Sequence, residues 1–218
     1  MDTYRVADYI ADFVADIGVR HVFLLPGGGA MHLVDAVGKN ARLTAIPCLH
    51  EQACAISAEA YSRIDGNFGV AVVTTGPGAT NAVTGVVGAW IESVPMLVIS
   101  GQVKRSDMLS GSQLRQKGVQ EVDIVSMVRS VTKYAVTVAR PEDIRRELEK
   151  AVRLAKEGRQ GPVWIDVPLD VQGAPVDPVT LSGLDELPAV VASPSSEEIQ
   201  RIVDMLRNAE RPLILVGH

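Results

Sequence analysis

The sequence predicts an α/β fold in which six parallel strands form one sheet with helices on both faces. Short apolar runs of strand length alternate with stretches whose apolar residues recur at helical spacing. Because these runs are nearly all apolar and do not alternate with polar residues, they indicate strands covered on both faces. The composition, with 47% hydrophobic and 22% charged residues in a chain of 218, is that of a folded globular protein.

The elements follow in order along the first 170 residues. An amphipathic helix is expected at residues 6–17, with Thr3 as its cap and Gly18 at its end. Strands are expected at residues 22–25, 43–46, 70–75, 96–100, 134–138 and 163–167. Further helices are expected between them, at residues 53–63, 79–91 and 141–156.

After residue 170 the organisation changes. Residues 171–194 are irregular and rich in proline, as is typical of a linker. Ser195 and Glu198 then form a capping-box pattern ahead of an amphipathic helix, and residues 212–216 have the pattern of a strand. One helix and one strand cannot bury a core. We therefore expect one domain at residues 1–170 and, at residues 195–218, the truncated start of a second.

Charge and cysteine content disfavour several classes of protein. With 21 Lys and Arg against 26 Asp and Glu, the net charge of −5 disfavours binding to nucleic acid or to an anionic membrane. The apolar stretches are interrupted before they reach membrane-spanning length. Two cysteines are too few for a disulfide framework, and the first residues lack the apolar core of a signal peptide. These features predict a cytoplasmic protein without a membrane or nucleic-acid partner.

Three strand-to-helix junctions carry the candidate ligand-binding residues, because the crevice of an open parallel sheet lies at the carboxyl ends of its strands. They are PGGGA at residues 26–30, HEQ at residues 50–52 and TTGPGATN at residues 74–81. Each junction also has an explanation that involves no ligand. The first could be a tight turn, the second a carboxylate that complements a helix dipole, and the third a turn with an Asn cap. A metal cluster of Cys48, His50 and Cys54 is disfavoured, since the change from strand to helix scatters these side chains. We expect no metal ligands.

The combination of these junctions resembles one known family. The strings LLPGGGA, HEQACAISAEAYSR, VVTTGPGATNAVTGVVGAW, VPMLVISGQV, GVQEVDIV and GRQGPVWIDVPLDV occur in this order. Together they are similar to the pyrimidine-binding N-terminal domain of thiamine-diphosphate enzymes, and most similar to the acetolactate synthase-like branch. The resemblance covers residues 3 to about 170, and residues 195–218 match the start of that family's central domain.

The resemblance implies a thiamine-diphosphate-dependent carboligase or lyase that acts on a 2-oxo acid such as pyruvate. Glu51 matches the glutamate that hydrogen-bonds the cofactor's aminopyrimidine and activates it. Gln120 matches a glutamine on the substrate side, and Val119 replaces the usual Phe, which leaves the substrates open. The remaining matched positions lie beside the cofactor or face the active site: Pro26, Gly27, Gly28, Thr75, Gly76, Pro77 and Asn81.

The sequence contains only half of that family's cofactor site. The Gly-Asp-Gly motif and distant Asn that hold diphosphate and Mg²⁺ in the family have no match here. The resemblance therefore implies that an absent domain holds Mg²⁺, that a homodimer or higher homo-oligomer shares the site, and that the fragment alone is inactive. It leaves open whether FAD binds to the full-length protein.

The subunit interface is expected at the helices of residues 53–63 and 79–92. Small side chains there would allow close contact between helices, and packing within the chain is the alternative explanation for them. The small residues are Ala82, Gly85, Gly88 and Ala89.

Two alternatives come from other classes of protein. A nucleotide-binding Rossmann-like domain is disfavoured, because His32 occupies the third glycine position of that fingerprint. A non-catalytic interaction subunit of the same fold is disfavoured by the presence of Glu51.

Overall fold

The computed structural model describes residues 3–65, 68–109, 113–184 and 193–215. The chain divides into two compact units, Met1–Asp185 and Glu186–His218. The candidate site residues all lie in the first unit.

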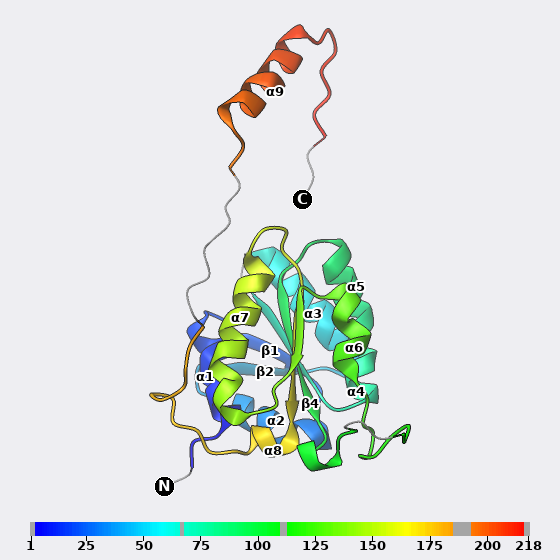
Figure 1. Ribbon diagram of the computed structural model, residues 1–218, viewed down its shortest axis with the longest axis vertical. Helices are drawn as coiled ribbons and strands as arrows, with labels where there is room; N and C mark the ends of the chain where they lie inside the picture. Colours follow the sequence, from blue (N-terminus) through cyan, green and yellow to red (C-terminus); the bar gives the residue numbers. More distant parts are fainter. Residues whose placement is uncertain (1–2, 66–67, 110–112, 185–192, 216–218) are drawn as a thin grey trace. The chain divides into compact units, whose positions relative to one another are not determined.

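The first unit contains a six-stranded sheet in which every strand pair is parallel, so the predicted fold class is confirmed (Figure 1). The order across the sheet is β2-β1-β3-β4-β6-β5. The carboxyl ends of β1, β3 and β4 are therefore neighbours. The strands are β1 (His21–Leu24), β2 (Thr44–Pro47), β3 (Gly69–Val73), β4 (Met96–Gln102), β5 (Tyr134–Thr137) and β6 (Val163–Pro168).

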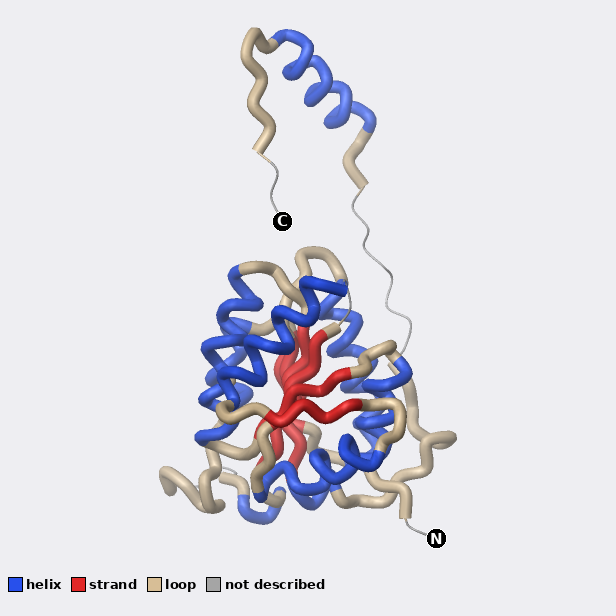
Figure 2. Tube along the Cα trace, turned by 180° about the vertical axis from the view of Figure 1, so that it is seen from behind, coloured by secondary structure: helices blue, strands red, loops and turns tan. Residues whose placement is uncertain are grey.

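Helices cover both faces of the sheet, as Figure 2 shows. Successive residues of β3 enter different apolar clusters: Val70 and Val72 enter one, Ala71 and Val73 the other. The first cluster packs beneath α1 (Val6–Asp16), α2 (Met31–Lys39), α7 (Ile144–Lys156) and α8 (Leu169–Gln172). The second packs beneath α3 (Glu51–Asp65), α4 (Pro77–Asn81), α5 (Val83–Ile91) and α6 (Ile124–Val128).

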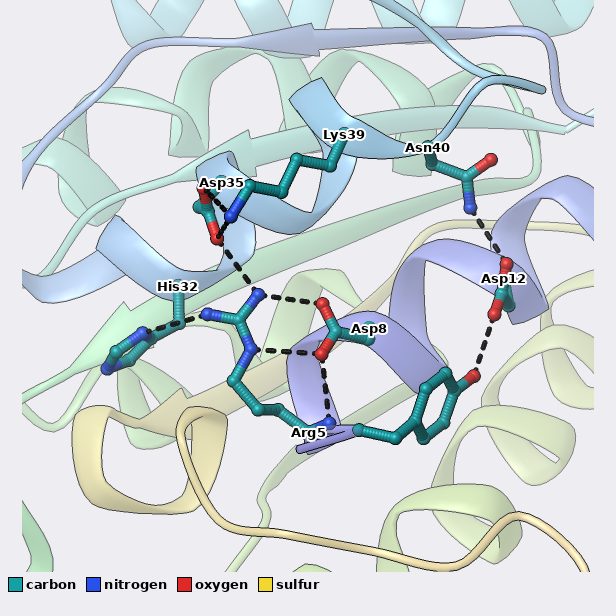
Figure 3. Close-up of polar contacts among 8 residues, drawn as sticks. Arg5, Asp8, Asp12, His32, Asp35, Lys39 and Asn40 are labelled. Atoms are coloured by element: carbon teal, nitrogen blue, oxygen red, sulfur yellow. Dashed lines mark hydrogen bonds and ion pairs between the residues drawn. The ribbon is translucent and has the colours of Figure 1, made fainter. Parts of the chain in front are cut away.

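The predicted first helix begins at Val6, as expected, but its cap differs from the prediction. Its N-cap residue is Arg5, so the assignment of Thr3 as the cap is wrong. The Arg5 backbone N–H donates to Asp8 Oδ2 at 2.9 Å, and the guanidinium Nη2 contacts Asp8 Oδ1 at 2.7 Å and Asp35 Oδ2 of α2 at 2.9 Å (Figure 3). The ion pairs fix the start of α1 against α2, which the local sequence pattern does not show.

The helix predicted at residues 79–91 is two helices, α4 and α5, which meet at Ala82. The Ala82 N–H donates to Ala79 O, three residues back, and this tighter bond interrupts the α-helical ladder. The helix α2 lies in a crossover that the sequence pattern did not assign as helical. Strand β3 ends at Val73, so Thr74 and Thr75 belong to the following loop.

The second unit contains α9 (Ser196–Asn208). Its predicted capping box is confirmed: Glu198 N–H donates to Ser195 Oγ at 3.2 Å, and Ser195 N–H donates to Glu198 Oε2 at 2.8 Å. Residues 212–215 form no strand, so the predicted strand is wrong for these residues. The described part of this unit contains no other strand with which they could pair. The domain boundaries expected from the sequence stay predictions. Among the described residues, no helix has the length and apolar character needed to cross a membrane.

Candidate functional site

The loops after β1 and β3 pack directly on one another, because these strands are neighbours in the sheet. Gly29 N–H donates to Thr74 Oγ1 at 3.1 Å. A Cβ on Gly27 would lie 2.5 Å from Thr74 Cβ, and a Cβ on Gly29 would lie 1.8 Å from Thr75 Oγ1. Both glycines are therefore needed for the close approach of the two loops. The first predicted junction thus contacts the third within one chain.

Glu51 lies at the first position of α3, in the turn where the helix dipole favours a carboxylate. Glu51 is 8% exposed, and Asn81 Nδ2 at the end of α4 donates a hydrogen bond to Glu51 Oε2 at 2.9 Å. A Cβ on Gly78 would lie 3.0 Å from Glu51 Oε1, so glycine at this position leaves that oxygen uncrowded. The second and third junctions therefore meet at one buried carboxyl group whose orientation Asn81 fixes.

Thr75 adds an unsatisfied polar atom to this edge of the sheet. The residue is buried, and its Oγ1 has no hydrogen-bond partner among the described residues. Buried hydroxyl groups nearly always have partners, so an orphaned one in a loop at the carboxyl edge singles out this edge as a candidate site.

The loop after β3 also contacts Gln120. Gly76 has a φ of +59°, which favours glycine, and a Cβ there would lie 1.9 Å from Gln120 O. Gln120 has a φ of +62° and an exposed side chain, and the neighbouring Val119 is 84% exposed. Pro77, the first residue of α4, is exposed beside this contact.

The structure thus brings together most of the residues that the sequence singled out. Glu51 is hydrogen-bonded to Asn81, and Gly76 packs on Gln120. Gly27 and Thr75 lie in the two packed loops. Pro26 and Gly28 are exposed, and a Cβ on Gly28 would meet no described atom within 4 Å.

Sequence reasoning included Gly29, Thr74 and Gly78 in the predicted junctions but assigned no individual role to them. Their contacts depend on which strands are neighbours, and a local pattern does not contain that order. A further omission is Asp166, which is 1% exposed in β6. An acidic residue inside an otherwise apolar strand was a visible signal for a buried polar contact.

Cys54, near Glu51, lacks the deprotonated thiol that a metal ligand requires. Burial, and second the nearby Cys48, raises the pKa of the Cys54 thiol to about 12, so Cys54 stays protonated at neutral pH. The described residues contain no group of three or more His, Cys, Asp or Glu that could hold a metal ion.

A buried, oriented carboxyl group and an orphaned hydroxyl, at the edge where three loops meet, make the carboxyl ends of the strands of this α/β domain a candidate ligand site. The family model described as "Thiamine pyrophosphate enzyme, N-terminal TPP binding domain" matches residues 4–127. The chain belongs to this family, and the curated relatives to which it is similar are acetolactate synthases.

Three relatives illustrate the similarity. "Acetolactate synthase 1, chloroplastic" of Oryza sativa subsp. japonica is 36% identical over 97% of this chain and 32% of its own length. "Acetolactate synthase large subunit" of Buchnera aphidicola is 34% identical over 100% of this chain and 38% of its own. "Acetolactate synthase, chloroplastic" of Arabidopsis thaliana is 34% identical over 97% and 31%. The chain thus spans about a third of the length of the curated relatives it matches.

Proposed function

We propose that this chain forms the pyrimidine-binding half of a thiamine diphosphate site in an acetolactate synthase-like enzyme. The observation that carries the proposal is the buried Glu51 carboxyl group, held by Asn81 where the junctions meet. The family match and the names of the relatives support it. They also favour it over the nucleotide-binding alternative.

The residues at this edge fit the aminopyrimidine end of the cofactor. The Thr75 hydroxyl, buried against Gly29, has no partner among the described residues and is an unsatisfied polar group beside the proposed site. Gly78 presents no side chain to Glu51 Oε1. Pro77 fixes its own φ at the start of α4, and Gly76 permits the positive φ of +59° that the preceding turn requires.

Each residue has a distinct role in the proposed reaction. Thiamine diphosphate, when bound, supplies a ring carbon that adds to the carbonyl group of a 2-oxo acid such as pyruvate. Glu51 shares a proton with a pyrimidine nitrogen through its carboxyl group, which is general acid–base work. Asn81 holds that carboxyl group in place, and Gln120 contacts the substrate from the neighbouring turn.

The diphosphate end of the cofactor requires other residues. Mg²⁺ prefers carboxylate and phosphate oxygens, and the described residues hold no cluster that would bind a metal. We therefore assign the diphosphate and Mg²⁺ to a further domain, in a homodimer or larger homo-oligomer. FAD binding and a cytoplasmic location stay predictions.

Product analysis tests the proposal. The enzyme that carries this chain together with its diphosphate-binding domain is incubated with pyruvate, thiamine diphosphate and Mg²⁺. We expect release of carbon dioxide and formation of acetolactate, both dependent on the cofactor. Cofactor binding without consumption of any 2-oxo acid would contradict the proposed substrate class. Absence of cofactor binding would favour a non-catalytic interaction subunit.

A further inference from the structure

A polar cluster lies inside the otherwise apolar sheet, away from Glu51. Ser100 of β4 and Thr137 of β5 both pair in register with Asp166 of β6, so the three side chains lie on one face. Gln102 follows Ser100 by two residues and shares that face. The side chains point into the layer that α6 covers, where Trp164 is part of the apolar cluster. Ser100, Gln102 and Asp166 are each at most 2% exposed.

Hydrogen bonds join this cluster into a network centred on Asp166. Trp164 Nε1 donates to Ser100 Oγ at 2.8 Å, and Ser100 Oγ donates to Asp166 Oδ1 at 2.5 Å. Gln102 Nε2 and Thr137 Oγ1 each donate to Asp166 Oδ2 at 3.1 Å. A buried carboxyl group is costly without such partners, and here both oxygens have them.

Gln102 extends the network out of the sheet. Its Nε2 also donates to Val122 O at 3.0 Å, and its Oε1 accepts from Val103 N–H at 2.9 Å. The amide therefore cannot rotate without losing bonds at both ends. Gln102, Val122 and Asp166 line one cavity of about 440 Å³. Asp166 thus fixes Gln102, and Gln102 fixes the backbone at Val122.

Val122 ends the turn that carries Gln120. Inside the turn, Glu121 N–H donates to Gly118 O at 3.2 Å, and the Glu121 carboxylate accepts from the N–H groups of Lys117 and Gly118, each at 3.0 Å. The turn is therefore a unit held together by its own bonds. Its outer side contacts Gly76, through Gln120 O.

We propose that Asp166, acting through Gln102, is a positioning residue that holds the Gln120 turn against the loop after β3. The inference rests on the proposed function, which gives Gln120 its place on the substrate side. Asp166 itself lies in the interior of the sheet, so it acts on the site through Gln102 and does not touch substrate. A role in fold stability alone would require the hydrogen bonds to Asp166 but not the bond from Gln102 to Val122.

A pair of substitutions separates these two roles. Gln102→Met has a similar length but no donor, so it breaks the link between Asp166 and Val122. Thr137→Val removes another donor to Asp166 and leaves that link intact, which makes it the matched control. Asp166→Val removes the acceptor, and Asp166→Asn keeps an oxygen that Gln102 can reach.

Amide hydrogen exchange of the 218-residue chain reads the position of the turn without any cofactor. We expect the Gly118 and Glu121 amides to exchange about tenfold faster in Gln102→Met and Asp166→Val, because a turn that is no longer tied to the sheet at Val122 O opens more often and exposes its inner bonds to water. Exchange in Thr137→Val and Asp166→Asn should match the wild type. Equal exchange in Gln102→Met and wild type, or an equal acceleration in Thr137→Val, would overturn the proposal.

Kinetics of the complete enzyme supply the second measurement. Gln102→Met is expected to lower kcat/KM for the 2-oxo acid about tenfold with unchanged affinity for thiamine diphosphate, because the Gln120 turn and not the pyrimidine contact has moved. Equal loss in Thr137→Val would overturn the proposal. Failure of the proposed function is seen separately, as a wild-type enzyme that consumes no 2-oxo acid.

Discussion

Asp166 is a residue whose protonation the fold controls. Burial raises the pKa of Asp166 from 3.8 to about 7, although Ser100, Gln102 and Thr137 donate hydrogen bonds that lower it. Between about pH 4 and pH 7 the folded chain therefore retains a proton that the unfolded chain has lost. The free energy of unfolding falls as the pH rises through this window, by up to about 1.4 kcal/mol per pH unit.

Asp166→Asn is expected to remove this contribution, since the amide does not titrate. Denaturant unfolding between pH 4 and 7 should show that the free energy of unfolding of the wild type, relative to that of Asp166→Asn, falls as the pH rises. Arg115, Glu121 and Asp123 line the same cavity and are common to both proteins, so their titration largely cancels. A difference that is constant with pH would contradict the raised pKa.

Among the elements, α5 shows why a small residue is needed at one position and not at another. A Cβ on Gly85 would lie 2.6 Å from Ala55 Cβ and 2.9 Å from the Ala55 backbone carbon, so α5 packs on α3 at this point. A Cβ on Gly88 would meet no described atom within 4 Å.

Gly85→Ala is therefore expected to lower the free energy of unfolding by about 1–3 kcal/mol through overpacking. Gly88→Ala, one turn away in the same helix, should raise it by up to about 1 kcal/mol, because Ala favours the helix. Urea unfolding of both variants measures the two effects. Effects of the same sign and size would show that the contact with Ala55 does not constrain α5.

The same helix shows what the sequence could not establish. Its small residues indicate close packing either at a subunit interface or within the chain, and Gly85 and Ala89 are buried within the chain. Helical periodicity gives the face of a helix but not its neighbour. The six strands were predictable because each is a mostly apolar run of strand length. The contact of Gly29 with Thr74 was not, because it depends on the pairing of β1 with β3.

For the whole molecule, the division of the cofactor site predicts weak binding. The isolated 218-residue chain should bind thiamine diphosphate more weakly than micromolar, because the charge-assisted bonds to phosphate and Mg²⁺ lie in a further domain. Isothermal calorimetry measures this affinity. A micromolar or tighter dissociation constant for the chain alone would contradict the divided site.

Self-association is expected of the same chain. Ile56 on α3 is 46% exposed, and Trp90 and Ile91 on α5 are 40% and 63% exposed, so apolar surface remains on these helices. Sedimentation velocity should show a dimer whose population rises with concentration. A monomer at the highest accessible concentration would indicate that these helices do not form the interface.

The central claim is that Glu51 activates the cofactor, and exchange of the C2 proton of thiamine diphosphate in the complete enzyme tests it most directly. Glu51→Gln keeps an oxygen for Asn81 but removes the acid, and Glu59→Gln on the same helix is the control. Quenched NMR should show exchange slowed by about 10² to 10⁴-fold in Glu51→Gln alone. The thermal midpoint should change little, because the lost dipole interaction is worth about 1 kcal/mol at most. Normal exchange in Glu51→Gln would contradict the account and leave Glu51 as a carboxylate that only stabilises the start of α3.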